Sequence, residues 1–221
     1  MTILAFDFSA TQRSVAVWQG LEAEPVEVLD QGETRSLHPM TMVEEALRQA
    51  NVGREAVECI AVGLGPGSYT GVRVSIAVAQ GWQLAMGVKL VGLSTADGIA
   101  SGLAGEGTEG SVSVVIDAQR GEFYLAGYSL GKGTAQSAAP LRLARREDVE
   151  ARVAAGDVIV GPEVTRWFPT GRIAQPRAAV LARLATVRAE FKAGEFLEPI
   201  YLRETSFVKA PPPRPLPPLR S

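Results

Sequence analysis

The sequence predicts an α/β protein made of two lobes, each of which combines β-strands with helices. Three strand-like runs followed by an amphipathic helix open the chain. A glycine-rich segment at 102–110 then provides a flexible connection, and strands and helices alternate again after it. We therefore expect a first lobe at 1–105, a second lobe at 106–205 and a proline-rich, disordered tail at 206–221.

The first strands are expected where short apolar runs lie between turn residues. Residues 2–8 and 14–18 are close enough to form a hairpin, and residues 26–30 are a third extended run. The helix that follows has Pro39 near its first turn. Its apolar residues recur at helical spacing: Met40, Val43, Leu47 and Ala50.

The rest of the first lobe alternates strand and helix around a glycine-rich loop at 64–70. Cys59 lies in an apolar run and is expected to be a buried strand residue. Ser94 or Thr95 can cap the last helix before the connection. The expected elements are strand 57–63, helix 71–86, strand 89–92 and helix 96–103.

The second lobe is expected to begin with an antiparallel pair, 111–117 and 122–128, joined by a turn. A helix is expected at 145–154 and a short strand at 157–160. A last helix is expected at 178–193, where Gly194 follows one apolar stripe: Val180, Leu184, Val187 and Phe191.

The composition excludes several kinds of catalytic site. The chain has 221 residues, 46% hydrophobic and 21% charged, which is typical of a globular protein that needs no disulfide or structural metal. It has one histidine, His38, and one cysteine, so it cannot form a His/Cys zinc site, a CxxC pair or a disulfide. We expect no metal site, and catalysis would have to use carboxylates, hydroxyls, backbone amides or a partner.

The start of the chain lacks the basic and long apolar segments of a signal peptide, and no run approaches the ~20 apolar residues of a membrane span. With a lone cysteine, this predicts a cytoplasmic protein without a membrane partner. Residues 1–110 carry a net charge of −7 and residues 111–221 one of +5. The basic half could meet a nucleic acid, but ordinary solvated charge is the favoured explanation.

The densest motif is the glycine-rich loop within 63–73, which lies between a buried strand and a helix. Such a loop can present backbone N–H groups to a phosphate or another anion, and Gly65, Gly67 and Ser68 are the candidates. An equally weighted alternative is that the glycines only permit a tight turn with close packing. The loop lacks the residues of a Walker A motif, a GxGxxG motif or a nucleophile elbow.

Two carboxylates at expected strand ends are candidates for binding a magnesium nucleotide. Asp7, followed by Ser9, ends the first strand, and Asp117 ends a strand of the second lobe. If the two face each other across a cleft, they could hold a hydrated Mg²⁺. The alternative is that each aspartate caps a turn.

Four motifs in this order resemble the TsaB (YeaZ) family, subunits of the bacterial machinery that makes N6-threonylcarbamoyladenosine (t6A) in tRNA. The motifs are Ile3-Leu-Ala-Phe-Asp-Phe-Ser9, Gly63-Leu-Gly-Pro-Gly-Ser-Tyr-Thr-Gly-Val-Arg73, Ile116-Asp-Ala-Gln-Arg-Gly-Glu-Phe-Tyr124 and Pro199-Ile-Tyr-Leu-Arg203. The resemblance covers about residues 2 to 205. It implies the actin-like ATPase fold, with a ribonuclease H-like mixed sheet and flanking helices in each lobe.

The resemblance also implies a non-catalytic role in forming t6A at position 37 of ANN-decoding tRNAs. In that family the catalytic subunit is the paralogue TsaD, and the pair recruits the ATPase TsaE. No cofactor is expected to bind tightly to this chain; ATP or ADP with Mg²⁺ could bind near the junction with the partner. Contact with tRNA is expected only through the complex. No catalytic residue is expected here, and the chain alone is expected to form a homodimer. The implied partner interface comprises Met40, Val43, Leu47, Val72, Arg73, Ile76 and Ala79.

One departure from the pattern bears on nucleotide binding. Phe8 and Ala10 occupy positions where TsaB-like chains commonly carry threonine, which weakens the first loop as a phosphate site. The alternative function is a self-sufficient actin-like ATPase or small-molecule kinase that uses Asp7 and Asp117. A peptidase is disfavoured, because Ser68 has no neighbouring histidine in the sequence.

Overall fold

A computed structural model describes residues 1–20, 23–32, 37–188 and 190–203. Its first sheet has the strand order β3-β2-β1-β4-β5. The first three strands are antiparallel, and β4 and β5 run parallel to β1. The strands are β1 (Ile3–Asp7), β2 (Arg13–Trp18), β3 (Val26–Asp30), β4 (Cys59–Gly63) and β5 (Lys89–Leu93).

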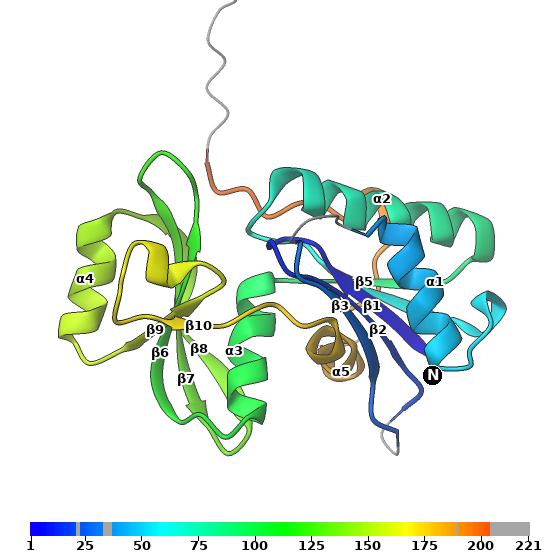
Figure 1. Cartoon of the computed structure of the whole chain (residues 1–221), viewed down its shortest axis with the longest axis horizontal. Helices are drawn as coiled ribbons and strands as arrows, with labels where there is room; N and C mark the ends of the chain where they lie inside the picture. Colours follow the sequence, from blue (N-terminus) through cyan, green and yellow to red (C-terminus); the bar gives the residue numbers. More distant parts are fainter. Residues whose placement is uncertain (21–22, 33–36, 189, 204–221) are drawn as a thin grey trace, which may run out of the picture.

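Helices α1 (Pro39–Gln49) and α2 (Tyr69–Met86) cover one face of this sheet (Figure 1). The ends of α2 follow the local sequence: the Ser68 hydroxyl accepts the Gly71 N–H at the start, and Gly87, at φ 69°, ends the helix in the left-handed region. Between α1 and β4, the chain forms the η1 turn (Arg54–Ala56). Alternate residues of β1 face this layer, so the first-lobe core forms as the sequence predicts.

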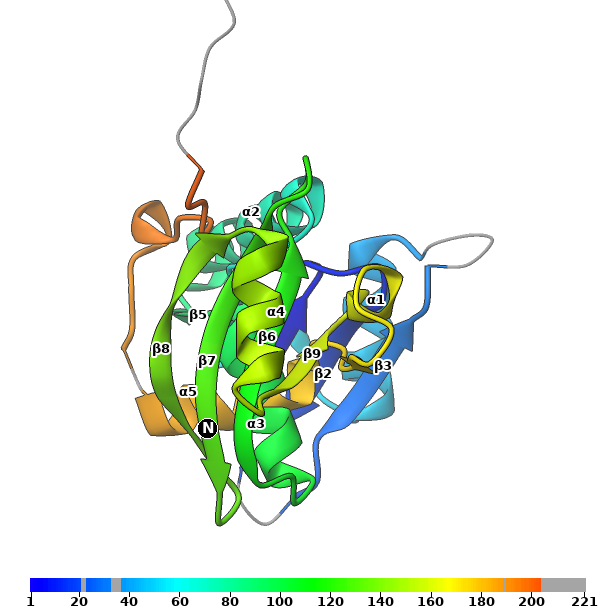
Figure 2. The same ribbon diagram turned by 90° about the vertical axis from the view of Figure 1, so that its left-hand side faces the viewer.

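The second sheet repeats the connectivity of the first, with the strand order β10-β9-β6-β7-β8. Helix α4 (Arg146–Ala154) lies across its outer face (Figure 2). Two strands, β8 and β10, were not predicted, because β8 is a half-exposed edge strand and β10 has only two residues. The strands are β6 (Gly110–Asp117), β7 (Phe123–Gly131), β8 (Thr134–Ala144), β9 (Val158–Gly161) and β10 (Arg172–Ile173), with the η2 turn (Val164–Arg166) after β9.

The last helix of each half packs on the sheet of the other half. Helix α3 (Thr95–Gly105) joins the core of the second sheet, whereas α5 (Ala178–Arg188) joins that of the first. Both helices lie between the sheets and touch each other (Figure 1). The sequence ranges 1–105 and 106–205 therefore do not separate the two packed bodies, because each range contains a helix that packs on the other sheet.

Helix α5 also ends earlier and faces differently than predicted. It stops at Arg188, and the backbone N–H of Lys192 donates to the Leu90 carbonyl, 2.9 Å away, before the η3 turn (Gly194–Phe196). The buried residues of α5 are Ala178, Leu181, Ala182 and Ala185, while Val187 is 82% exposed. The predicted stripe is wrong because the side of α5 that faces the sheet carries Leu181 and three alanines, which let the helix approach closely, while Leu184 is only partly buried.

Two expectations concern the C-terminal tail and membrane-spanning helices. The proline-rich tail predicted at 206–221 lies outside the described residues. Within those residues, none of the helices has the length and apolar character needed to cross a membrane.

Candidate functional site

A cleft of about 810 Å³, called the interlobe cleft below, lies between the two halves of the molecule. Its walls come from loops at equivalent places in the two sheets: the β1–β2 loop and the start of α2 on one side, the β6–β7 loop and the segment after β9 on the other. A segment after η3 closes one end. The lining residues used below are Ser9, Thr11, Gly67, Ser68, Tyr69, Arg73, Asp117, Gln119, Arg120, Tyr124, Glu163, Tyr201 and Arg203.

Asp7, the first predicted metal-binding carboxylate, does not reach this cleft. It is fully buried; Oδ1 accepts the Ser9 N–H at 2.8 Å and Oδ2 accepts the Thr95 hydroxyl at 2.7 Å. Burial raises the pKa of the Asp7 carboxyl, and hydrogen bonds from Ser9 and Thr95 only partly offset this. Asp7 thus holds the β1–β2 loop to the start of α3.

The glycine-rich loop packs directly on the β1–β2 loop. A Cβ at Gly67 would lie closer than 3.0 Å to the Ser9 carbonyl oxygen, and one at Gly71 would collide with the Phe8 carbonyl. The Ser68 N–H donates to the Ser9 carbonyl at 2.6 Å. The glycines are therefore required for close backbone approach, which favours the packing alternative over a free anion loop.

The remaining loop candidates lie on either side of this contact. Gly65, at φ 84° and followed by a cis peptide bond to Pro66, does not line the cleft; its carbonyl accepts the Thr95 N–H at 2.8 Å. Ser9, Gly67 and Ser68 do line it, but the Ser68 hydroxyl is used to cap α2.

Asp117, the second predicted carboxylate, is half-buried and does line the cleft. Its Oδ1 accepts the Gln119 N–H at 2.8 Å, the turn-capping alternative stated above. Gln119 and Arg120 both adopt left-handed backbone conformations, at φ 66° and 58°, which are unfavourable for residues other than glycine. Sequence reasoning missed these two residues, although their quoted motif contained them.

The geometry does not fit a magnesium ion shared by Asp7 and Asp117. Both oxygens of Asp7 are sealed from the cleft, and the Thr11 hydroxyl donates to Glu163 Oε1 at 3.0 Å from the opposite lobe. A carboxylate thus lies against the loop where an actin-like ATPase would need to bind phosphate. Across the described ranges, no three His, Cys, Asp or Glu side chains are grouped so that they could hold a metal ion.

The predicted partner-interface residues divide into core and surface. Val43, Leu47, Val72, Ile76 and Ala79 are at most 6% exposed and pack in the first core; Met40 is half-buried against it, and Arg73 is exposed. Five of the seven are therefore packing residues that a partner could not reach. The apolar spacing correctly located α1 and α2, but it selected the residues of each helix that face the core of the first lobe.

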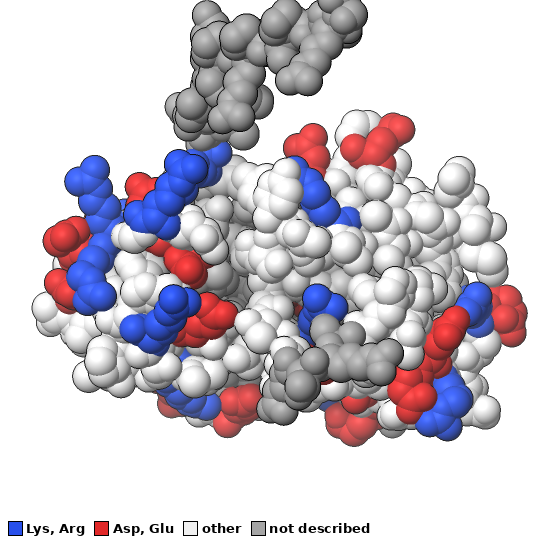
Figure 3. All heavy atoms as spheres, turned by 45° about the horizontal axis from the view of Figure 1, so that its top comes forward, with Lys and Arg blue, Asp and Glu red and all other residues white. Residues whose placement is uncertain are grey.

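The outward side of α2 has the composition of a contact surface. Arg73 is the single charged residue among its 18 residues. Leu84 is 91% exposed, and Ala77, Gly81 and Ala85 are exposed at intervals of four. Figure 3 shows that the surface around this helix is largely uncharged, while Lys and Arg side chains gather on the second lobe.

Comparison with known proteins identifies the fold and the family. A family model described as TsaD, tRNA N6-adenosine threonylcarbamoyltransferase, matches residues 35–185. The structure of YeaZ from Pseudomonas aeruginosa matches with a TM-score of 0.77 and 28% identity, covering 91% of this chain and 99% of that one. Two sheets of equal strand order with flanking helices form the actin-like ATPase fold with ribonuclease H-like lobes.

Curated relatives support the same assignment over a shorter span. The chain is 35% identical to the tRNA threonylcarbamoyladenosine biosynthesis protein TsaB of Escherichia coli over 129 residues, covering 58% of this chain and 55% of that protein. For TsaB of Bacillus subtilis the identity is 28% over 142 residues, covering 63% and 60%. The chain thus spans little more than half the length of these relatives. Since the family model matches most of the chain, the chain belongs to the TsaD family, in which its named relatives are TsaB (YeaZ) proteins.

Proposed function

We propose that this chain is a non-catalytic subunit in the formation of t6A at position 37 of ANN-decoding tRNAs, and that it binds the catalytic TsaD subunit. The names of the relatives supply the pathway. The chain's own chemistry supports the non-catalytic part: the whole sequence has a single histidine, and the hydroxyl of Ser68 is used to cap α2. A partner must then supply the reacting groups.

The observation that carries the proposal is the uncharged outer side of α2. Protein surfaces that bind partners are depleted of charge at their centres. Burying Leu84, which is 91% exposed, would contribute roughly 2 kcal/mol to association. The exposed small residues Ala77, Gly81 and Ala85 allow a second helix to approach closely, so a helix of the partner is the expected contact.

The same surface accounts for the other proposed assemblies. Without TsaD, two copies of this chain pair through α2 and form a homodimer, because the same small and apolar residues are self-complementary. The TsaE ATPase then joins the TsaD-bound form. ATP or ADP with Mg²⁺ binds at the partner junction rather than through Asp7, whose carboxylate is fully buried.

The proposal is tested with the full chain and TsaD from the same organism, by light scattering of the mixture. We expect a defined complex for the wild type and at least a tenfold weaker one for Leu84→Arg. The matched control is Val187→Arg, which places the same charge at an 82% exposed position on α5, on the opposite face of the first sheet, and should leave the complex unchanged. Absence of a wild-type complex, or equal binding by Leu84→Arg, would overturn the proposal.

The same preparations test the alternative of a self-sufficient ATPase or kinase. Asp7 and Asp117 would have to act together for that function, and the burial of Asp7 argues against it. We expect the isolated chain to release no phosphate from ATP beyond the level of an Asp117→Asn control. Turnover that depends on Asp117 would favour the alternative.

A further inference from the structure

A second hollow of about 430 Å³ adjoins the interlobe cleft and shares Arg120 with it. The second hollow lies between the β6–β7 loop and the start of α4 and is lined by Arg120, Gly121, Glu122, Arg145, Arg146 and Glu147. The two hollows meet at Arg120; together, called the path below, they reach from the start of α2, past the β6–β7 loop, to the start of α4.

The arginines along this path are unusually free of ion-pair partners. Of the 15 arginines in the described ranges, 10 form ion pairs with described residues; the exceptions are Arg13, Arg73, Arg120, Arg145 and Arg166. Three of those five, Arg73, Arg120 and Arg145, line the two hollows, and all three are exposed. Their positive charge is therefore available to an anionic ligand.

The acidic residues of the path are mostly engaged by neighbours. Arg203 donates to Glu122 at 2.5 Å and to the Gln119 carbonyl at 3.1 Å. Glu163 accepts the Thr11 hydroxyl at the far end of the cleft, and Asp117 accepts the Gln119 N–H. These two hydrogen bonds leave the charges of Glu163 and Asp117 in place, and Glu147 also lines the second hollow. The two hollows are together lined by five arginines and four carboxylates, so their net charge is positive by one.

Aromatic rings line the same end of the cleft. Tyr69 and Tyr201 stack with ring centroids 5.4 Å apart, and the guanidinium carbon of Arg73 lies 3.5 Å from the Tyr69 centroid. The Tyr201 hydroxyl accepts a hydrogen bond from Arg73 at 2.7 Å, which fixes the cluster. Tyr69 nevertheless remains 61% exposed, so a planar group from outside can contact the part of the ring that Arg73 and Tyr201 leave uncovered.

We propose that this path binds a single-stranded segment of RNA, with phosphates on Arg73, Arg120 and Arg145 and a base stacked on Tyr69. Arginines that follow a groove and an exposed aromatic ring are the two features that non-sequence-specific binding of single strands requires. A free magnesium nucleotide fits less well, because it would use one phosphate cluster, whereas the arginines are distributed over two hollows. The left-handed backbone of Gln119 and Arg120 places Arg120 where both hollows meet.

This inference goes beyond the proposed function by giving this chain a direct contact with RNA, in place of the indirect contact that the family resemblance implies. It is tested on the isolated full chain with a fluorescein-labelled ten-nucleotide single-stranded RNA, by fluorescence anisotropy at several salt concentrations. We expect Arg120→Ser/Arg145→Ser to weaken binding at least tenfold and to reduce the slope of log K against log salt by about 1.4, since each phosphate contact of a single strand contributes about 0.7. Tyr69→Ser should weaken binding about tenfold without changing the salt slope.

The control variant is Arg166→Ser, because Arg166 is also exposed and without an ion pair but lies outside both hollows. It should bind the RNA like the wild type. Equal losses in Arg166→Ser and the double variant, tighter binding of an RNA duplex than of the single strand, or displacement of the RNA by equimolar ADP with Mg²⁺ would each overturn the proposal. The double variant is also mixed with TsaD; an intact complex there separates failure of this inference from failure of the proposed function.

Discussion

Asp7 and Asp117 hold equivalent positions in two sheets of the same connectivity, yet only one of them faces the interlobe cleft. Each ends the first strand of its sheet, and each accepts the N–H of the residue two positions later at 2.8 Å. Asp7 is additionally enclosed by Thr95 and by the Gly63 backbone, whereas Asp117 remains half-exposed. Equal topology therefore places a carboxylate at a strand end, but the neighbouring elements decide whether a ligand can reach it.

The largest expected effect comes from filling the space that encloses Asp7. In Gly63→Ala the new Cβ would lie closer than 3.0 Å to Asp7 Oδ2, and both Asp7 oxygens are already fixed by hydrogen bonds. We expect a loss of about 3 kcal/mol in the free energy of unfolding, measured by urea denaturation. The counterpart Gly121→Ala, at φ 76° but with open space around its Cβ, should lose only about 1 kcal/mol. Equal losses would contradict the description of a sealed Asp7.

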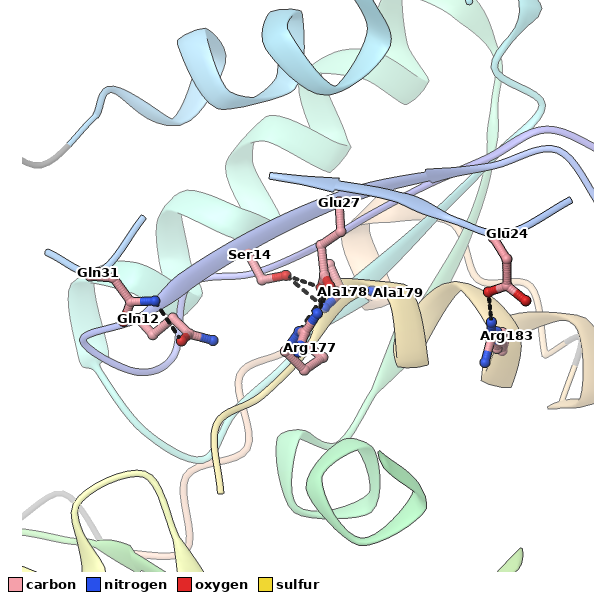
Figure 4. A network of polar contacts seen from close by, with 9 residues as sticks. All are labelled: Gln12, Ser14, Glu24, Glu27, Gln31, Arg177, Ala178, Ala179 and Arg183. Carbon is pink, nitrogen blue, oxygen red and sulfur yellow. Dashed lines mark hydrogen bonds and ion pairs between the residues drawn. The ribbon is translucent and has the colours of Figure 1, made fainter. Parts of the chain in front are cut away.

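A smaller effect is expected where α5 is attached to the first sheet. Glu27 on β3 accepts hydrogen bonds from Arg177 Nε at 2.8 Å and from the Ala179 N–H at 3.1 Å, and Ser14 accepts the Ala178 N–H (Figure 4). These contacts replace a local cap for α5. Glu27→Ala should cost about 2 kcal/mol, because the Glu27 side chain is only 7% exposed and capping groups are lost with the ion pair.

Glu24→Ala is the matched control for Glu27→Ala. Glu24 also pairs with an arginine of α5, Arg183, at 2.5 Å, but its side chain is 89% exposed (Figure 4). The free energy of unfolding should change by less than about 0.5 kcal/mol, since solvent screens such pairs. If both variants unfold at the same urea concentration, α5 is not anchored through Glu27.

Asp7 should also make the stability of the protein depend on pH. The pKa of Asp7 is raised in the folded state above its unfolded value of about 3.9, so the folded protein holds this proton more tightly. Its contribution to stability is therefore complete below that unfolded value and is lost as the pH rises through the folded pKa. Asp7→Asn should remove this loss, so its melting temperature at pH 8 should be higher than that of the wild type.

The melting curves of Asp7→Asn are compared with those of the wild type at pH 4 and pH 8. At pH 4 the difference should be smaller, since a larger fraction of the wild-type carboxyls is protonated at the lower pH. A difference for Asp7→Asn that is independent of pH would show that packing, not ionisation, is responsible.

The smallest expected effect lies on the exposed side of α2. Gly81 is in a helix interior with no atom near its would-be Cβ. Gly81→Ala should therefore stabilise the isolated chain by about 0.8 kcal/mol, in line with the helix propensities of the two residues. A loss of stability in thermal unfolding would mean that the outer side of α2 is already packed against a second copy.

Sequence reasoning located the strands and helices of the first lobe well, because their signals are local. The hairpin of β1 and β2 and the helix with Pro39 at its start both depend on residues close in the chain. The predicted capping of α3 is wrong in its chemistry: Ser94 occupies the N-cap position without a side-chain capping bond, and the Thr95 hydroxyl donates to Asp7 instead. The partners of α3 and α5 could not be predicted in this way, since an amphipathic helix shows that it packs but not on which sheet.

The candidate site was predicted less completely, and for a related reason. Asp117, Ser9, Gly67 and Ser68 were found and do line the interlobe cleft. Arg120, Tyr201 and Arg203 were missed as site residues because they come from a turn and from a segment far along the chain, and only the fold brings them beside Tyr69. Most of the predicted interface residues are buried, because apolar periodicity identifies the side of a helix that packs in its own chain.

Because α3 packs on the second sheet and α5 on the first, the order in which the ribosome makes the elements matters for folding. The first sheet is complete in sequence at β5, but the helix that covers its second face begins only at Ala178. At the usual rates of translation, that face lacks its cover for several seconds after β5 has been made. Ribosome-bound chains that end between β5 and α5 should therefore present the first sheet to chaperones, and expression of either half alone should yield an insoluble product.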